Sequence, residues 1–283
     1  MRSDRIRIKI NKIGKGIMSK EKILERAAAA DCLSMRITEN VAAQQVDLNN
    51  WIFTNVNVAD GSKVLELCCG TGAQTAHLVD KVGETGKVVA VDISRKALDT
   101  IWEKTPFGLK SRLTLIEAGL DDLPAALQGA VGNIDGFDMV FCAYGLYYSK
   151  DAKNVMATAM KRLKPTGSMV IVGPFGPNNG ALFSLLEQHK VKISEYVMHT
   201  SRDFMWTEVI PWATVNFPSI RIRTLVNPVH WHSAQNVISY WKNSTFFDAD
   251  RLPQVQAGLE EHFRTQSVFT NEKWIMLLEA CHG

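Results

Sequence analysis

Residues 64–75, VLELCCGTGAQT, change from an apolar pattern to a glycine-rich turn within a few positions. The apolar half predicts a buried strand, and the residues after the glycines predict the start of a helix. Because glycine has no Cβ, a Gly-x-Gly turn between a strand and a helix lets a ligand approach the backbone N–H groups. A turn of this kind alone is a weak signal, so the residues around it decide what it binds.

Two acidic residues flank this turn. Glu66 lies inside the predicted strand, four residues before Gly70, and a charged side chain in a buried strand is uncommon unless it has a partner. Asp92 ends the next predicted strand, about 20 residues after Gly72, where an acidic side chain accepts hydrogen bonds from ribose hydroxyls. The alternatives are a surface or capping role for Glu66 and a helix cap for Asp92, although Ser94 could also serve as that cap. Together the turn, the spacing and the acid indicate a ligand that carries a ribose.

Short apolar segments alternate with helical patterns through the middle of the chain. This order predicts a parallel sheet covered by helices on both faces. The predicted strands are 63–68, 87–92, 112–117, 137–142, 168–173, 220–231 and 273–281. The predicted helices are 19–32, 39–58, 74–82, 95–104, 152–163, 233–247 and 253–265.

Two common nucleotide motifs do not fit the turn. A dinucleotide site expects G-x-G-x-x-G, but Thr75 stands in place of the third glycine, which disfavours a nicotinamide-dependent oxidoreductase. A phosphate-binding loop of the form G-x-x-x-x-G-K-[ST] is absent from the sequence. The turn therefore predicts another kind of nucleoside cofactor.

The pattern hydrophobic–Glu–hydrophobic–x–x–Gly–Thr–Gly, followed by a strand-end acid, resembles the class I S-adenosylmethionine-dependent methyltransferases. The stretch FDMVFCAYGLYYSKDAKNVMATAMKRLKPTGSMVIVGPF is similar to the small-molecule branch of that family, which includes the ubiquinone-type methyltransferases. The match covers about residues 60–175. It implies an α/β fold with a Rossmann-like, doubly wound, seven-stranded sheet that is mostly parallel and has an antiparallel last strand. It also implies S-adenosyl-L-methionine as cofactor and S-adenosyl-L-homocysteine as product.

The resemblance also implies roles for individual residues. Gly70 and Gly72 would let the backbone approach the methionyl part of the cofactor, and Glu66 would hold that part electrostatically. Asp92 would bind the ribose. The remaining implied cofactor neighbours are Ile93, Gly119 and Leu120 around the adenine, and the segment from Cys142 to Tyr144 beneath the sulfur. Gly119 stands where the family often has an acidic residue, and Asp121 and Asp122 come slightly later. The resemblance therefore implies that backbone groups of Gly119 and Leu120 contact the adenine instead.

The acceptor and any general base are open at this stage. Methyl transfer needs mainly alignment, and a base only where the acceptor is protonated. The candidates are Tyr144, His230 and His232; the two histidines alternate with Trp231 in a predicted strand, where a structural role is the alternative. Further aromatic residues either line a pocket or form the core of the added helices: Trp51, Phe53, Tyr147, Tyr148, Trp206, Trp212, Trp231 and Trp241.

The cysteines predict neither a disulfide framework nor a metal site. The sequence has five of them, an odd number, with no C-x-x-C spacing. Cys68 and Cys69, as neighbours in an extended strand, would point to opposite faces and pack as small hydrophobic residues. No His/Asp/Glu spacing supports a metal site either, so we expect no metal.

Charge and composition limit the possible binding partners and locations of the protein. Hydrophobic residues make up 46% of the 283 residues, and no apolar run is long enough to span a membrane. Residues 1–26 carry a net charge of +6, and the rest of the chain carries −3. The sequence from Met18 onward is typical of the start of a helix, so we interpret residues 1–17 as an upstream extension or a leader. Without a secretory signal, the expected location is cytoplasmic. The Asn-Pro-Pro-[Phe/Tyr] motif is absent, which counts against methylation of DNA bases or glutamine.

We therefore expect a small-molecule methyltransferase and no nucleic-acid partner. The predicted domains are 1–58, a tail with lid helices; 59–175, the cofactor-binding core; 176–272, a helical cap inserted in the core; and 273–283, the final core strand. Two alternatives stay open: a protein of the same fold that binds the cofactor without methyl transfer, and a protein or RNA methyltransferase that uses residues 1–26. The atom methylated and the oligomeric state are also open, with a homodimer among the options.

Overall fold

The computed structural model of the chain describes residues 18–130 and 134–282. Seven strands form one sheet in the order β3-β2-β1-β4-β5-β7-β6. The strands are β1 (Lys63–Leu67), β2 (Lys87–Asp92), β3 (Leu113–Glu117), β4 (Phe137–Ala143), β5 (Leu163–Pro174), β6 (Ser219–Trp231) and β7 (Phe269–Cys281). The first five are parallel, and β7 runs antiparallel to both β5 and β6. The predicted fold class is confirmed.

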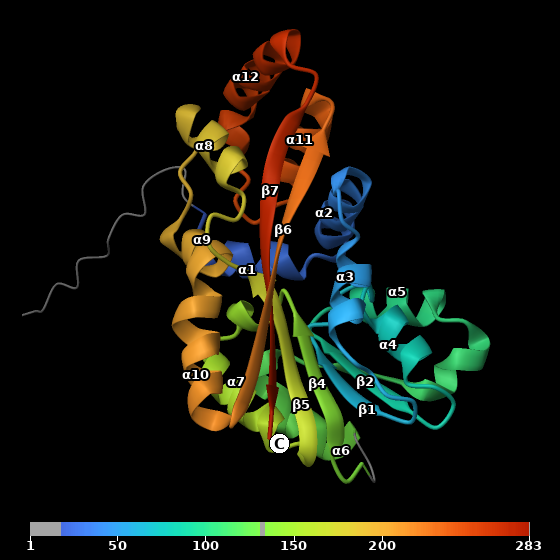
Figure 1. Cartoon of the computed structure of the whole chain (residues 1–283). Helices are drawn as coiled ribbons and strands as arrows, with labels where there is room; N and C mark the ends of the chain where they lie inside the picture. The colour runs from blue at the N-terminus through green and yellow to red at the C-terminus, as the bar shows by residue number, and fades with distance from the viewer. Residues whose placement is uncertain (1–17, 131–133, 283) are drawn as a thin grey trace, which may run out of the picture.

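Helices cover both faces of this sheet (Figure 1). One face packs α6 (Leu123–Ala130), α7 (Ala152–Met160) and α10 (Ile210–Asn216) around Leu67, Cys142 and Ile171. The other face packs α3 (Leu48–Asn55), α4 (Thr75–Lys81) and α5 (Arg95–Lys104) around Val64, Phe141 and Val170. The inner strands are buried on both sides, which explains why they read as continuous apolar runs.

A third core lies beyond the end of the sheet. The long strands β6 and β7 continue past β5, and in Figure 1 this two-stranded ribbon rises into a cap with α8, α11 and α12. Trp231 and Trp241 are fully buried at its centre. The cap helices are α8 (Gly180–Gln188), α9 (Glu195–Met198), α11 (Ala234–Lys242) and α12 (Leu252–Thr265). The region after residue 176 therefore contains a strand ribbon as well as helices.

The chain between α9 and α10 is helical without being a regular α-helix. Two π-helical segments, His199–Asp203 and Met205–Val209, connect α9 to α10. The sequence predicted only a loosely helical run here. Short 3₁₀ segments occur at Phe107–Arg112, Leu120–Asp122, Leu146–Tyr148 and Ala249–Arg251.

The N-terminal helices differ from the prediction. The expected helices 19–32 and 39–58 are replaced by α1 (Lys20–Ala28), α2 (Ala30–Ala43) and α3, with a break at residues 44–47. The break forms because Gln45 N donates to Pro228 O at 2.9 Å, while Asn227 accepts from Val46 N and donates to Val46 O. Asp47 then caps α3 through Asn50 N. A contact 181 residues away in sequence thus overrides a helical pattern.

The predicted boundaries were otherwise accurate to a few residues. The strand expected at 168–173 is longer, and the helix expected at 233–247 ends at Lys242, with Ser233 as its predicted cap. The last strand begins at Phe269 rather than residue 273. The expectations for residues 1–17 and for Gly283 lie outside the described residues. No described helix is long and apolar enough to cross a membrane.

Candidate functional site

The glycine-rich turn lies at the carboxyl end of β1. Gly70 and Gly72 have φ angles of 54° and 87°, a region that residues with a Cβ rarely adopt. Gly70 N donates to Asp92 Oδ2 at 2.8 Å, so the turn is fastened to the end of β2. Asp92 Oδ1 also accepts from Ser94 N at 2.9 Å. Each carboxylate oxygen keeps a second lone pair, which leaves Asp92 able to accept from a bound ligand.

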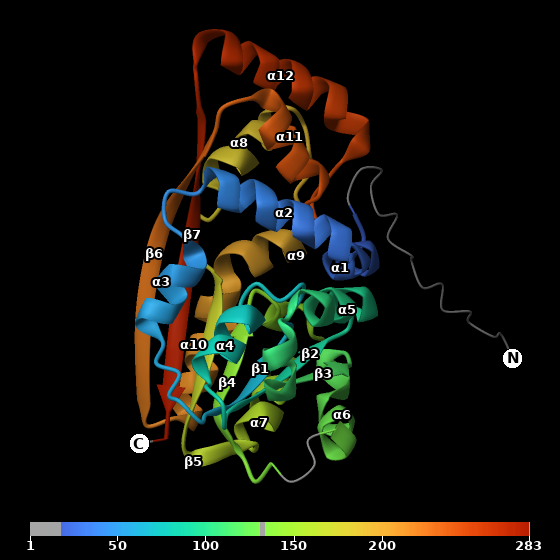
Figure 2. The ribbon, with the colours of Figure 1, turned by 90° about the vertical axis from the view of Figure 1, so that its right-hand side faces the viewer.

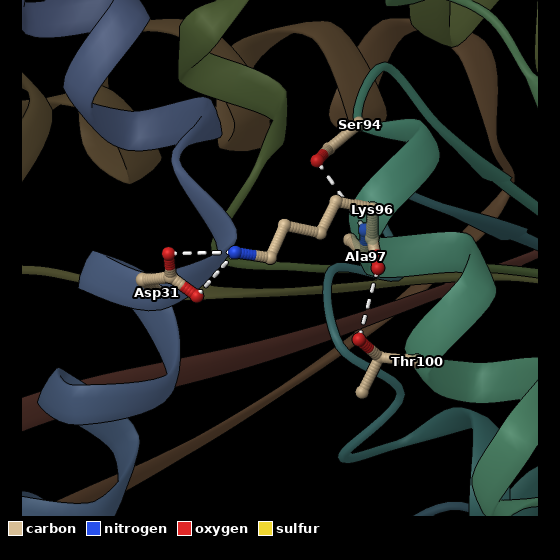
Figure 3. Close-up of polar contacts among 5 residues, drawn as sticks. All are labelled: Asp31, Ser94, Lys96, Ala97 and Thr100. Atoms are coloured by element: carbon tan, nitrogen blue, oxygen red, sulfur yellow. Dashed lines mark hydrogen bonds and ion pairs between the residues drawn. The ribbon is translucent and has the colours of Figure 1, made fainter.

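Asp92 is not the cap of the next helix. Ser94 takes that role, because its hydroxyl accepts from Ala97 N at 3.4 Å at the start of α5, as Figure 3 shows. Ile93 lies between Asp92 and Ser94 in the sequence, and its side chain is 61% exposed. A Cβ on Gly119 would lie 3.7 Å from Ile93 Cδ1, so these two predicted adenine neighbours lie together. Leu120 follows directly in a half-buried position.

Glu66 is buried beneath the turn. Its exposed fraction is 1%, and among the described residues its Oε2 has no hydrogen-bond partner. Thr75, at the start of α4, is equally buried, and its hydroxyl is also unpartnered in the described part of the chain. Burial raises the pKa of Glu66 to about 8; the Thr75 hydroxyl opposes this and the charge of Asp92 adds to it. A buried carboxylate with a free oxygen is a favourable site for a cationic ligand group.

Thr75 was missed as a site residue by the sequence reasoning. It was noted only because it replaces the third glycine of a dinucleotide motif. In the structure the hydroxyl of Thr75 lies beside the Glu66 carboxyl. Its position at the first residue of the helix after the turn was the available signal.

The two cysteines of the turn are not neighbours in an extended strand, which corrects the prediction. β1 ends at Leu67, and Cys68 has a φ of 55°. Cys68 packs so closely against Gly145 that a side chain on Gly145 would overlap it. Contact with the Cys142 thiol and burial raise the pKa of Cys68, and burial raises the pKa of Cys69. These thiols therefore pack rather than react at neutral pH.

Tyr144 follows β4 at this same edge of the sheet. Its φ is 57°, and its N–H donates to Val172 O at 2.9 Å. Burial raises its pKa, as it does for Tyr147 and Tyr148 in the following 3₁₀ turn. Cys142, two residues earlier, is 2% exposed and pairs with Leu67 of β1. The turn, Asp92 and the end of β4 thus meet at one edge of the sheet.

The predicted histidines lie elsewhere. His230 is in the ribbon half of β6, where Nδ1 is 3.0 Å from Thr270 Oγ1. His232 lies after the end of β6 and is exposed. In the described part of the chain, no hydrogen bond joins either to Glu66, Asp92 or Tyr144. Their catalytic role stays a prediction that this geometry does not support.

Most of the predicted pocket aromatics pack into cores. Trp231 stacks on Phe269, and Trp241 Nε1 donates to Phe246 O. Phe53 stacks on His77 with ring centroids 5.0 Å apart. Trp212 contacts Phe217, and Trp51 of α3 is half-buried against the core on the other face of the sheet. Trp206 contacts Phe175 but is 52% exposed. Of the predicted group, the three tyrosines past β4 are the ones at the site.

Helix α2 covers the turn. A Cβ on Gly70 would be 2.8 Å from Leu33 Cδ2 of α2. In Figure 2, α2 lies between the cap helix α11 and the core helices α4 and α5. Arg36 Nη1 donates to Asn243 O at the end of α11, and Asp31 forms an ion pair with Lys96 of α5 at 2.7 Å (Figure 3). This helix therefore joins the cap to the candidate site.

In the described residues, no group of three or more His, Cys, Asp or Glu side chains could hold a metal ion. The donors at the turn instead suit an organic ligand with an ammonium and a ribose: an unpaired buried carboxylate, a glycine turn and a second carboxylate with free lone pairs. The geometry therefore fits the cofactor that the sequence implied.

Comparison with known proteins agrees. The ubiE/COQ5 methyltransferase family matches residues 31–195. The chain belongs to this family. It is therefore an S-adenosylmethionine-dependent methyltransferase, as the resemblance of its motifs implied. The match begins inside α2 and ends before the cap is complete, so it includes every predicted cofactor residue but not β6, α11 or β7.

Individual relatives cover part of the chain. The demethylmenaquinone methyltransferase of Lactobacillus johnsonii is 29% identical over 174 residues, 56% of this chain and 68% of that protein. The one from Bacillus velezensis is 30% identical over 115 residues, 41% of this chain and 46% of that protein. The chain thus spans under half of the length of the second relative.

Two solved structures share the fold. The YcgJ protein from Bacillus subtilis has a TM-score of 0.55 at 14% identity, covering 82% of this chain and 97% of that one. The Haemonchus contortus phosphoethanolamine N-methyltransferase 2, solved with S-adenosylhomocysteine, has a TM-score of 0.54 at 13% identity. It covers 94% of this chain and 61% of that one. At these identities the likeness concerns the fold alone.

Proposed function

We propose that the chain transfers a methyl group from S-adenosylmethionine to a small-molecule acceptor of the quinol type. The acceptor class is suggested by the relatives, which are named for demethylmenaquinone. The buried Glu66 carboxyl carries the cofactor half of the proposal, because a carboxyl with a free oxygen and a raised pKa has its natural partner in a cation. When bound, the cofactor supplies a methyl group already activated as a sulfonium.

Each residue at the turn would bind a different part of the cofactor. Glu66, beside the Thr75 hydroxyl, receives the amino group, and Gly70 and Gly72 allow the backbone to approach. Asp92 accepts from the ribose hydroxyls with the lone pairs that Gly70 and Ser94 leave free. The adenine would pack on exposed Ile93, which lies beside Gly119, with Leu120 next to it, and Cys142 and Tyr144 would lie under the methionyl part.

Residues 18–58 act as a lid in this proposal, with 59–175 as the core and 176–272 as the cap that holds the acceptor. Leu33 of α2 lies against Gly70 of the turn, which supports a lid at this position. The ion pair of Asp31 with Lys96 of α5 is exposed and can be released, whereas the contact of Arg36 with the end of α11 is partly buried and keeps α2 attached to the cap. Closure of α2 would exclude water from the site. The acceptor would then lie between α2 and the tyrosines past β4.

Isothermal titration with S-adenosylhomocysteine tests the cofactor half. The purified chain is expected to bind it, and Asp92→Ala to weaken binding strongly. Asp99→Ala is the matched control, because Asp99 is an exposed residue of α5 that pairs only with Arg95 among the described residues. Absence of binding, or equal affinity for Asp92→Ala and the wild type, would contradict the proposal.

Transfer of a labelled methyl group tests the acceptor half. Reduced demethylmenaquinone with a shortened side chain is the probe, with RNA and a denatured protein extract as comparison acceptors. Label in the quinol supports the proposal. Label in RNA or protein would replace it with one of the alternatives, and binding without transfer to any of the three would favour a cofactor-binding protein without this activity.

A further inference from the structure

A buried tyrosine and a half-buried lysine form a pair in the cap, on the side of α2 and of the tyrosines past β4. The Tyr240 hydroxyl of α11 is 2.7 Å from Lys273 Nζ of β7. Lys273 Nζ also donates to Asn179 Oδ1 at 2.6 Å and lies 4.1 Å from the centroid of the Tyr240 ring. Tyr240 is 6% exposed. Three segments that are distant in sequence therefore hold one phenol group in place.

The groups around this pair come from both sides of the site. Tyr144 and Tyr148, past the end of β4, are close enough for the charge of Tyr240 to affect their titration. From α2, Arg36 and Asn40 act on the Tyr240 hydroxyl. The charged and titratable groups that face Tyr240 are thus Lys273, Arg36, Tyr144 and Tyr148. None of these four is a carboxylate.

Asn40 adds a second sign of a ligand. Its Oδ1 is buried and has no hydrogen-bond partner among the described residues, although its side chain lies beside the Tyr240 hydroxyl. A buried polar atom without a partner is costly, and a bound group that donates a hydrogen bond to it would remove that cost. The Tyr240 cluster therefore has an unused acceptor where a hydroxyl or amino group of a substrate can donate.

The electrostatics separate Tyr240 from every other tyrosine of the chain. Burial acts to raise its pKa, but the charge and hydrogen bond of Lys273, together with Arg36 and Asn40, outweigh burial and hold the pKa below its ordinary value. The sequence has five tyrosines. The other four have raised pKa values: Tyr144, Tyr147, Tyr148 and Tyr196. A phenolate is the basic form that proton abstraction requires.

We propose that Tyr240 is the general base of the methyl transfer and that Lys273 is its positioning residue. This rests on the proposed function. The acceptor's O–H, N–H or C–H bond breaks, its proton moves to the phenolate oxygen of Tyr240, and the electron pair stays on the acceptor to form the bond to the methyl carbon. Lys273, with Arg36, stabilises the negative charge that develops on the acceptor.

The same contacts could merely fasten the cap. Asn271 Nδ2 also donates to Asn179 Oδ1 and its own Oδ1 accepts from Leu182 N, so the network ties β7 to α8. Loss of activity in a variant would then prove nothing about proton transfer. The test needs a readout that a structural role does not change.

Titration of tyrosinate absorbance provides that readout without any substrate. Between about pH 7 and about pH 11, the wild type is expected to form one tyrosinate per chain before the other four. Tyr240→Phe is expected to remove this first step of the absorbance titration, and Lys273→Gln is expected to move it to higher pH. Tyr196→Phe, which removes another partly buried hydroxyl, is the matched control and keeps it. Simultaneous titration of all five tyrosines, or an early step that persists in Tyr240→Phe, would overturn the proposal.

Kinetics with reduced demethylmenaquinone as the probe connect the pair to catalysis. Tyr240→Phe is expected to lower kcat by about 10²–10⁴-fold, the usual contribution of a general base, with the affinity for S-adenosylhomocysteine within about twofold of wild type. In Lys273→Gln, the acidic limb of the plot of kcat/KM against pH is expected to move to higher pH. Tyr196→Phe is expected to keep the wild-type kcat and the wild-type pH dependence. An unchanged limb in Lys273→Gln would overturn the proposal.

Failure of the proposed function has a different signature. If the wild type binds S-adenosylhomocysteine but transfers no methyl group to the quinol, the acceptor assignment is wrong while the tyrosinate titration still decides whether Tyr240 is poised as a base. If Tyr240→Phe does not fold, the pH shift in Lys273→Gln decides the same question.

Discussion

The two halves of the site are built in different ways. The cofactor half comes from β1, the turn and the end of β2, and its residues lie within about 30 positions of one another along the chain. The proposed acceptor half takes Arg36 from α2, Tyr240 from α11 and Lys273 from β7, which are up to 237 positions apart. Local backbone geometry specifies the first half, and packing of distant segments specifies the second. Substitutions should therefore affect one half without the other.

The largest effect is expected for Asp92→Ala. Hydrogen bonds to a charged group contribute about 1.5–3 kcal/mol each, so loss of the ribose contacts is expected to weaken S-adenosylhomocysteine binding by about 100-fold or more. Calorimetry measures this loss. The early tyrosinate step of Tyr240 should stay in place, and its disappearance in Asp92→Ala would show that the two halves are not independent.

The next effect is a pH dependence of cofactor affinity. Burial raises the pKa of Glu66 to about 8, so below that pH the free protein holds the carboxyl protonated and neutral. A cationic amino group favours the ionised form, so binding releases a proton and affinity rises with pH. Between pH 6 and pH 7.5, affinity is expected to rise by roughly 20-fold, and Glu66→Gln to bind weakly with little pH dependence. Titrations in buffers of different ionisation enthalpy report the proton release.

If the affinity for S-adenosylhomocysteine depends on pH equally in the wild type and in Glu66→Gln, a group other than Glu66 loses the proton on binding. Asp80→Asn, at an exposed position of α4, is the matched control and should keep the wild-type profile. A flat wild-type profile would mean that Glu66 is ionised before the ligand arrives.

Packing between the ends of β1 and β4 should also be sensitive. Gly145→Ala places a methyl group against Cys68 and is expected to cost about 1–2 kcal/mol of the free energy of unfolding. Cys68→Gly removes the opposing side chain and also suits the positive φ at that position. The double variant is expected to recover most of the loss, as measured by urea denaturation. If the two substitutions lower the free energy of unfolding additively, the contact between residues 68 and 145 is not the cause of the loss.

The smallest effect is expected at the lid. Asp31 and Lys96 form an exposed ion pair, and such pairs contribute about 0–1 kcal/mol and weaken with salt. Asp31→Asn should change cofactor affinity by about twofold or less, and the difference should vanish at high salt. Leu33→Ala, which uncovers the turn, should have the larger effect of the two. The reverse order would mean that charge rather than packing closes α2.

Much of the cofactor half could be predicted because its signals are local. The turn, Glu66 and Asp92 follow from apolar strand patterns and from the special backbone freedom of glycine. The exceptions are local conformations that tertiary contacts impose. Cys68 leaves the strand early with a positive φ, and residues 44–47 interrupt a helical pattern because Asn227 pairs with Val46.

The acceptor half could not be predicted in the same way. His230 and His232 attracted attention because they are chemically capable, but the structure bonds one to Thr270 and exposes the other. Tyr240 and Lys273 carried no motif, and their environment depends on the cap folding back over α2. Neither residue type nor spacing reveals which of five tyrosines is buried beside a lysine.

The sequence by itself determined where the core strands lie along the chain, the cofactor turn and the acid that follows it. These features depend on the apolar period of a strand, on the backbone freedom of glycine and on short spacings, all of which act between neighbouring residues. Only the tertiary structure decided which thiols pack, which aromatics form cores, and which side chains meet across the cap. Those outcomes depend on burial and on contacts between distant segments, since desolvation and the charge of a neighbour, rather than residue identity, set how Glu66 and Tyr240 ionise.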